Sequence, residues 1–294
     1  MTVTAQKGAP RRVRTPVTGA ASAAVRPVLE APRRPARVLA VFPAGAYLEV
    51  RTELEPSVIA VITGTATRLP NALLLPGPLP RLTVGDEAVV GDGAVELGPL
   101  SMRVRRWWDP APHTGRVDPV RLERALPALA PDGGEGLAGN GNIELLTRAC
   151  RTGWLLGVLT AAEQLVGLGP GLTPSGDDVL AGLLVTLRHI GKSAGVGQAV
   201  RVGDWLGATV TYDARTRTTP ISATLLHCAA QGAASPEVCG VLRAVAGRTP
   251  LEPALSRLRR LGHTSGSDLA QGIAIGLEAV LGMAGRGGLS GEAA

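Results

Sequence analysis

Aromatic side chains are scarce in this chain. Its 294 residues include four Trp, two Tyr and one Phe, which together make 2% of the sequence. So few rings exclude the stacking surfaces with which single-strand nucleic-acid binders hold bases. Hydrophobic residues still make up 45% of the chain, so a packed core is expected and wholesale disorder is excluded.

Cysteine is also rare, with Cys150, Cys228 and Cys239 as the three examples. Three is an odd number, and the spacing matches no zinc motif, so a complete disulfide framework and a zinc site are both excluded. The simplest interpretation is three reduced, buried thiols in a cytoplasmic protein.

Long apolar runs are missing as well. The best run, residues 179–187, ends at Arg188, well short of the roughly 18 residues that a membrane helix needs. Arg11-Arg12 precedes only a weakly apolar stretch, a poor match to a twin-arginine export signal. The sequence therefore predicts no membrane partner.

The positive charge is concentrated in one segment. The formal net charge is +6, and residues 1–37 hold eight basic residues against one acid, whereas the rest of the chain has 22 basic and 23 acidic residues. A basic tail does not make a nucleic-acid-binding domain, so no nucleic-acid partner is expected. Because residues 1–36 show no hydrophobic period, we interpret them as a disordered basic tail.

The remaining chain shows two patterns in succession. Over residues 37–107, short runs of Val, Leu and Ile alternate with Gly, Pro and Asp, which predicts a β module, either a sheet or a barrel. Over residues 118–284 the hydrophobic period is helical, and several helix starts combine a capping residue with proline. We therefore expect an α+β protein, with a small N-terminal all-β module followed by a larger all-α helical domain.

Two loops of the helical part repeat one motif. Residues 168–182 and 261–272 both reduce to Ser-Gly-x-Asp-x-x-x-Gly at the start of an apolar helix. Ser-x-x-Asp is close to a capping box, and the closing glycines, Gly182 and Gly272, suit close helix packing. For either loop alone, structural capping is the simpler explanation.

Three features favour a ligand site instead. Glycine in the first turn, at Gly176 and Gly266, lets a ligand approach the backbone amides. The first loop also has Gly169 and Gly171 ahead of its helix, as in backbone nests for anions. Because the motif occurs twice, two helix N-termini converging on one cleft would hold an anion, or two carboxylates would face a cation.

The candidate catalytic residues are Asp178, Asp268 and His263. The candidate ligand-binding residues are Gly169, Gly171, Thr173, Ser175, Gly176, Asp177, Arg215, Arg217, Ser222, Thr264, Ser265 and Gly266. The two arginines are included because their forks match phosphate and carboxylate groups. A solvated, capped loop explains them equally well, and a lone histidine beside a helix start is more often structural.

These two loops, together with residues 221–226, resemble a bacterial family that includes the AllH-type subunit of oxamate carbamoyltransferase. The similarity extends from about residue 37 to residue 283. It implies a subunit of a carbamoyltransferase-type complex that handles small anions, carbamoyl phosphate and oxamate or a related acid, in the catabolism of ureides and purine nitrogen. The implied partners are a small anionic substrate and the other subunits of a hetero-oligomeric enzyme.

The resemblance leaves two roles open, because the characterised member acts only together with other subunits. If the chain takes part in catalysis, amides at Gly176 and Gly266, with Arg215 and Arg217, would hold phosphate, and the two aspartates would orient an amine or a Mg²⁺ ion. The cofactor and the metal are otherwise not specified. The alternative is a non-catalytic scaffold or regulatory subunit of a multi-subunit enzyme.

Overall fold

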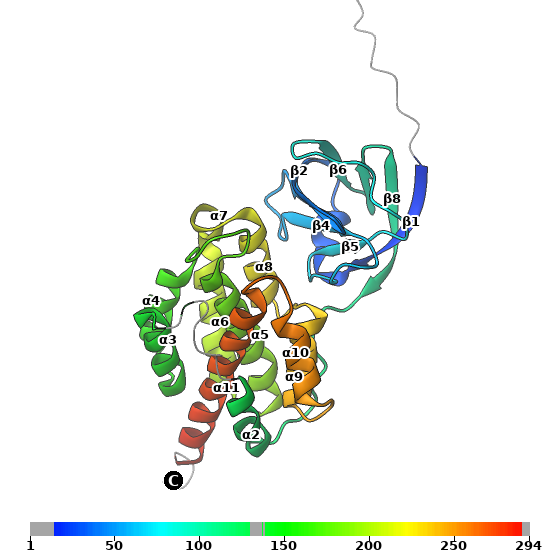
Figure 1. Ribbon diagram of the computed structural model, residues 1–294. Coiled ribbons are helices and arrows are strands. Elements are labelled where there is room, and N and C mark those ends of the chain that lie inside the picture. The colour runs from blue at the N-terminus through cyan, green and yellow to red at the C-terminus, as the bar shows by residue number, and fades with distance from the viewer. Residues whose placement is uncertain (1–14, 130–136, 138, 290–294) are drawn as a thin grey trace, which may run out of the picture.

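The computed structural model describes residues 15–129, 137 and 139–289. Figure 1 shows two parts, a β-barrel built from about the first third of the chain and a bundle of helices that follows it. The two parts have separate hydrophobic cores, one inside the barrel and one among the helices. The first described strand belongs to the barrel, and the last long helix runs through the bundle.

The barrel is closed and contains eight strands in the order β1-β5-β4-β3-β2-β6-β7-β8. Closure comes from β1 and β8, which pair in parallel from Thr15↔Leu100 to Ser22↔Trp108. The strands are β1 (Thr15–Ser22), β2 (Arg34–Phe42), β3 (Gly45–Val50), β4 (Val58–Ile62), β5 (Ala72–Leu74), β6 (Glu87–Gly91), β7 (Ala94–Leu97) and β8 (Leu100–Trp108).

Local sequence explains the clearest hairpin of the barrel. Strands β6 and β7 are joined by Asp92 and Gly93, which both have positive φ, 52° and 73°. This is the backbone that a two-residue hairpin turn of the primed type requires, and Asp-Gly supplies it readily. Along β8, buried Leu100, Met102 and Val104 alternate with more exposed residues, so one face of the strand fills the barrel.

The expected fold class is wrong for the N-terminal part. The β structure does not start at residue 37, because residues 15–36, predicted to be a tail, form β1, a 3-10 turn (Ala23–Val25), α1 (Arg26–Leu29) and the start of β2. Val25, Val28 and Leu29 are buried in the barrel core. Residues 1–14 of the predicted tail lie outside the described residues.

The physical reason for this error is that residues 15–36 show no hydrophobic period from which a strand could be predicted. β1 is made of small residues and pairs with β8 along its length. The arginines that follow β1 in this segment are exposed, whereas a few apolar residues between them are buried in the barrel core. The composition of this segment therefore indicated a flexible tail, whereas backbone pairing with β8 makes residues 15–22 a strand. Deletion of residues 1–35 would remove β1 and open the barrel.

Described residues after the barrel form helices. They are α2 (Pro119–Leu129), α3 (Gly141–Thr152), α4 (Leu155–Leu165), α5 (Ser175–Ser193), α6 (Gly197–Tyr212), α7 (Ala214–Arg217), α8 (Pro220–Ala230), α9 (Pro236–Val245), α10 (Leu251–Arg259) and α11 (Ser265–Leu289). Thr219 and Ser235 cap α8 and α9 through their hydroxyls, each ahead of a proline at the first helical position, as the sequence predicts. The three cysteines are free and buried.

Helices α5 and α11 pack closely along one another and share reciprocal glycine contacts. A methyl group on Gly182 would overlap the carbonyl oxygen of Leu269, and one on Gly272 would overlap that of Val179. Each helix therefore needs its glycine so that the other backbone fits against it. The closing glycines of the repeated motif serve helix packing, and they bring the N-terminal turns of α5 and α11 to the same place.

Helix α11 also has the length and composition of a membrane span. Its window Ser265–Gly285 has a mean hydropathy of 1.2, and 61% of that window is buried inside the protein. The helix contains no long uninterrupted apolar run, because Gly, Ser and Gln interrupt its apolar residues. The core helix of a folded domain meets the same criteria, so this finding is weak support for a membrane role.

The barrel contacts the helical bundle through α8 and α9. The amide of Val58 donates a hydrogen bond to Thr224 Oγ1 over 3.1 Å, and this contact is buried. Thr67 Oγ1 donates to Glu237 Oε1 over 3.1 Å. These contacts hold the barrel over the end of the bundle where α5 and α11 begin (Figure 1).

Candidate functional site

The two repeated loops lie against each other. Thr173 Oγ1, just before α5, is 3.0 Å from Ser265 Oγ at the start of α11, within hydrogen-bond distance. The expectation that both loops meet is therefore confirmed. Their role in ligand binding stays a prediction and depends on what the meeting point offers.

The serines and aspartates of the two motifs pair crosswise. The Asp178 carboxyl accepts hydrogen bonds from Thr173 of its own loop and from Ser265 of the other. The Asp268 carboxyl accepts from Thr264 of its own loop and from Ser175 of the other. A capping box would instead join each serine to its own helix, and α5 has no side-chain cap. The repeated motif thus joins two helices.

Burial dominates the electrostatics of these two carboxyl groups. It raises the pKa of Asp178 to about 7, with a further increase from the nearby Asp268 charge, although hydrogen bonds from Ser265 and Thr173 work against it. Burial also raises the pKa of Asp268, against hydrogen bonds from Ser175 and Thr264. Two close carboxylates out of water disfavour the doubly charged state. Near neutral pH, the protonated and ionised forms of Asp178 are therefore both populated.

One oxygen of each carboxyl group is unused. Asp178 Oδ2 and Asp268 Oδ2 are buried and have no hydrogen-bond partner among the described residues. A buried acceptor without a partner costs on the order of 1–3 kcal/mol, and more if it is charged. Such a group calls for an explanation, and a bound ligand is one.

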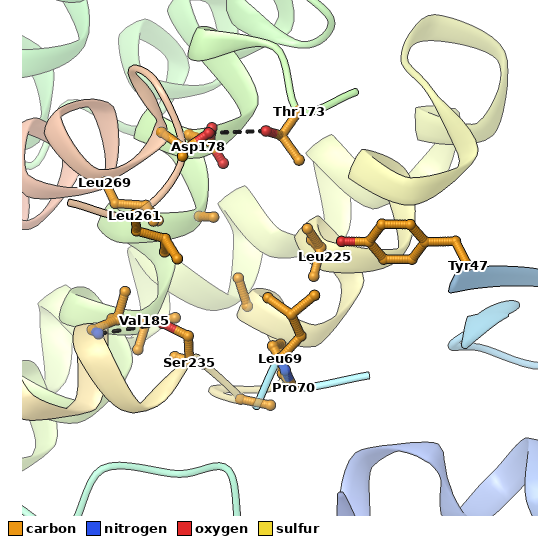
Figure 2. Close-up of a pocket in the computed structure, with 17 residues that line it drawn as sticks. Tyr47, Leu69, Pro70, Thr173, Asp178, Val185, Leu225, Ser235, Leu261 and Leu269 are labelled. Carbon is orange, nitrogen blue, oxygen red and sulfur yellow. Dashed lines mark hydrogen bonds between the residues drawn. The ribbon is translucent and has the colours of Figure 1, made fainter. Parts of the chain in front are cut away.

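Asp178 faces a small pocket between the barrel and the bundle, shown in Figure 2. The cavity has a volume of about 200 Å³. Its walls are mainly apolar, with Leu225 and Leu269 from helices and Leu69 from the barrel. None of the described residues that line it is Lys or Arg. The pocket therefore suits a small, mostly neutral group and offers an anion no cationic partner.

Tyr47 of β3 is the polar group that the barrel contributes to this pocket. Figure 2 shows its hydroxyl pointing away from the barrel toward Leu225, with Thr173 and Asp178 at the top of the view. Burial raises the pKa of Tyr47 to about 12, and the charge of Asp178 adds to the effect. The phenol therefore stays protonated and can both donate and accept a hydrogen bond.

Asp177 and Ser222 lie outside the pocket and hold the first loop in place. Asp177 Oδ1 accepts from the amide of Gly167 over 2.8 Å. Its Oδ2 accepts from Thr218 Oγ1 over 2.5 Å and from Ser222 Oγ over 2.6 Å. With 1% of its surface exposed, Asp177 has partners within the chain and anchors the loop to α8.

The glycines of the first turns face protein backbone. A methyl group on Gly176 would overlap the carbonyl oxygen of Leu165, and one on Gly266 would overlap that of Leu258. Their amides donate to Leu168 and Leu261, each over 2.9 Å. The backbone amides predicted to cradle an anion are thus occupied within the chain.

Several predicted ligand-binding residues are not brought to the pocket. Gly169 and Gly171 adopt positive φ values of 118° and 97° in the exposed loop before α5. Arg215 Nε donates to Glu55 Oε1 over 2.7 Å, and the Arg217 guanidinium donates to the carbonyl of Glu163. His263 is exposed, and none of these residues lines the cavity. The pocket brings together Thr173, Asp178 and Ser265, with Ser175, Thr264 and Asp268 behind them.

The barrel side of the site is not predicted by the sequence. Tyr47 and the Leu69-Pro70 segment line the cavity, as does Ser235 from the loop before α9. The Leu69-Pro70 segment stood within the resemblance to the carbamoyltransferase subunits but had no assigned role. Tyr47 carries no sequence signal beyond the general scarcity of aromatic residues.

The described residues form no group of three or more His, Cys, Asp or Glu that would hold a metal ion. Asp178 and Asp268 provide two carboxyl groups, whereas Mg²⁺ takes six oxygen ligands. Substrate and water would have to supply most of them. The site alone therefore gives no strong support for the Mg²⁺ expectation.

Comparison with known proteins agrees with the predicted resemblance over part of the helical domain. The model of a family described as oxamate carbamoyltransferase subunit AllH matches residues 165–277. The match runs from the end of α4 into α11 and contains both repeated loops; the barrel lies outside it. No solved structure matches the chain.

Proposed function

We propose that this chain is a subunit of a carbamoyltransferase complex and that its pocket binds the amide nitrogen of a small substrate. The family match supports the coarser statement, a subunit of an oxamate carbamoyltransferase that works in a multi-subunit complex. The finer statement, which group the pocket holds, is argued from the site.

The observation that carries the proposal is the free oxygen of Asp178. Oδ2 is a buried acceptor without a partner among the described residues, on a residue that lines a cavity without Lys or Arg. An N–H donor on the ligand would satisfy this acceptor, whereas a ligand oxyanion would face another carboxyl group. An amide NH₂ group therefore fits the pocket better than a phosphate or a carboxylate.

The chemistry of carbamoyl transfer has a role for such a group. The acceptor nitrogen forms a bond to the carbonyl carbon of carbamoyl phosphate, the carbon–oxygen bond to phosphate breaks, phosphate leaves, and the nitrogen loses a proton. Ionised Asp178 would orient the nitrogen and accept that proton. A pKa of about 7 suits a group that takes up and releases a proton near neutral pH.

The phosphate end of the reaction needs positive charge that this pocket does not supply. Transfer from carbamoyl phosphate depends on stabilising negative charge as phosphate leaves. We therefore assign that task to groups outside the pocket, on this chain or on the other subunits. We place the complex in the cytoplasm, where free thiols such as these three stay reduced.

A matched pair of ligands tests the proposal on the isolated chain. Oxamate and pyruvate have the same shape and charge, but oxamate has an NH₂ group where pyruvate has CH₃. Binding is measured by ligand-observed NMR at pH 8, where Asp178 is mostly ionised. We expect pyruvate to bind roughly tenfold more weakly or worse, because it leaves the Asp178 acceptor unsatisfied.

Two variants make this test specific. Asp178→Asn is expected to remove the preference for oxamate, and Asp204→Asn, an exposed aspartate on α6, is expected to keep it. Equal binding of oxamate and pyruvate to the wild-type chain, or an unchanged preference in Asp178→Asn, contradicts the proposal.

A structural role is the second candidate, and the crossed pairs favour it. The motif joins α5 to α11 through side chains, and its first-turn amides are used within the chain. A scaffold subunit would need nothing more from these residues. In that case neither ligand binds the isolated chain, and Asp178→Asn changes the free energy of unfolding alone.

A further inference from the structure

A second cavity at the junction of barrel and bundle has a different character. Its volume is about 850 Å³, and it is lined by Arg34, Arg37 and Arg51 of the barrel and by Arg215 of α7. It shares no lining residue with the pocket of Asp178. We call this cavity the arginine cleft.

Two of the four arginines have no acidic partner in the part of the chain that the structure describes. Arg37 pairs with Glu49 over 2.7 Å, and Arg215 pairs with Glu55. For Arg34 and Arg51 the described residues include no ion-pair partner. Among the described residues, Glu49 and Glu53 are the acids that line the cleft, and Glu55 pairs with Arg215 beside it, so the four arginines exceed the neighbouring acids by one charge.

The fold holds the two unpaired arginines at the same end of one β-ribbon. β2 and β3 pair antiparallel from Ala36↔Val50 onward. The amide of Arg51 donates to the carbonyl of Pro35 over 2.9 Å, which extends the ribbon by one residue. Arg34 and Arg51 therefore extend from a paired backbone in the wall of the cleft, so that less backbone freedom is lost on binding.

We infer that the arginine cleft binds a small anion that carries a phosphate group. Guanidinium forks match phosphate oxygens in pairs and keep their charge at any physiological pH. The cavity has room for a group larger than phosphate itself. Arg34 belongs to the segment predicted to be a disordered basic tail, and Arg37 is the first residue of the predicted β module. The barrel brings both of these basic residues into one cleft.

The inference does not depend on the proposed amide pocket. α8 passes from Pro220 in the cleft to Leu225 in the pocket, a rise of roughly 7 Å along the helix. The two cavities are neighbours with separate lining residues. Asp178→Asn is therefore expected to leave phosphate binding intact, so failure of one proposal is distinguishable from failure of the other.

Titration calorimetry of the full chain with pyrophosphate, at constant ionic strength, tests the inference. Arg34→Gln combined with Arg51→Gln removes the two unpaired charges, and both side chains are exposed, so the fold is expected to persist. Each lost charge-assisted contact is expected to weaken binding roughly tenfold. Arg105→Gln, an exposed β8 residue outside the cleft, is the control and is expected to bind like the wild type.

Three results of this titration would overturn the inference, and a fourth comes from a second ligand. They are no heat of binding with the wild-type chain, an unchanged dissociation constant in the double variant, and an equal loss in Arg105→Gln. Binding of duplex DNA without binding of pyrophosphate would also overturn it, because the cleft would then recognise a polymer by its charge.

Discussion

The two Ser-Gly-x-Asp loops share a sequence and differ in their surroundings. In both loops the glycine of the first helical turn packs against a backbone carbonyl of the preceding helix. In both, the serine donates a hydrogen bond to the aspartate of the other loop. However, only the first motif places its aspartate in the pocket wall, because the barrel lies over that side. Asp268 is 2% exposed and lies behind it.

This difference shows how one motif supports two tasks. The shared contacts hold α5 and α11 together, and the second loop contributes Ser265 and Leu261 to the pocket while its own aspartate stays behind. The first loop is also anchored by Asp177, where the second loop has Ser267. We therefore regard the pair as a structural junction of which one carboxyl group, Asp178, is available for binding.

The largest expected effect tests what the loops share. Gly176→Ala and Gly266→Ala both force a methyl group into a backbone carbonyl, so each is expected to lower the free energy of unfolding by about 3 kcal/mol or more. Chemical denaturation measures it. Gly240→Ala is the control, because no atom lies within 4 Å of the new methyl, and it is expected to be neutral or stabilising. If only one of the two glycine variants left the free energy of unfolding unchanged, the two loops would not be structurally equivalent.

The next effect separates the two aspartates through pH. In the unfolded chain Asp178 titrates near 3.8, and in the folded chain near 7. Between these values only the folded state keeps the proton, so stability falls as pH rises from about 4 to 7 and is level above that. Asp178→Asn is therefore expected to unfold at a higher temperature than the wild type at pH 8, with a gain of about 1–2 kcal/mol after the cost of a buried amide.

The same substitution at the second aspartate provides the contrast. Asp268→Asn is expected to give a smaller gain at pH 8 and to keep the preference for oxamate over pyruvate. Thermal unfolding at pH 5 and pH 8 measures the first property for both variants. If an Asp→Asn variant gained as much stability over the wild type at pH 5 as at pH 8, the buried charge of the aspartate would not be the cause of that gain.

A smaller effect compares the threonines beside the two aspartates. The hydrogen bond from Thr173 lowers the pKa of Asp178, so Thr173→Val is expected to raise that pKa further, by about one unit or less. Thr264→Val removes the corresponding donor to Asp268 and is expected to leave the Asp178 pKa nearly unchanged. Carboxyl ¹³C NMR titration measures both, and equal shifts in the two variants would contradict the assignment of donors.

The smallest expected change in stability tests the contribution of the barrel to the pocket. Tyr47→Phe removes the hydroxyl in the pocket but keeps the ring, whose centroid lies 5.4 Å from the ring centroid of Phe42. The free energy of unfolding is expected to change by less than about 0.5 kcal/mol, while oxamate binds several-fold more weakly. Unchanged binding would remove Tyr47 from the site.

The sequence predicts local features of this molecule well. Helix starts at Thr219 and Ser235 and the hairpin at Asp92-Gly93 depend on neighbouring residues, and the structure has them. The repeated motif also indicated two loops that meet. Capping by the loop serines was wrong, because their partners lie on the other helix, some 90 residues away.

Other features depend on contacts that no local pattern contains. The glycines at 176 and 266 were expected to admit a ligand, but a backbone carbonyl from another part of the chain occupies that space. β1 was taken for a tail because its strand identity comes from pairing with β8. Tyr47 reaches the pocket only because the barrel docks on α8, so it was not predictable from spacing.

The most direct measurement of the central claim is a crystal structure of the chain soaked with oxamate at pH 8. The account predicts oxamate in the cavity between barrel and bundle, with its amide nitrogen within hydrogen-bond distance of Asp178 Oδ2. Oxamate bound with its carboxylate toward Asp178, or bound elsewhere while this cavity stays empty, would contradict the account and leave the paired loops a structural junction.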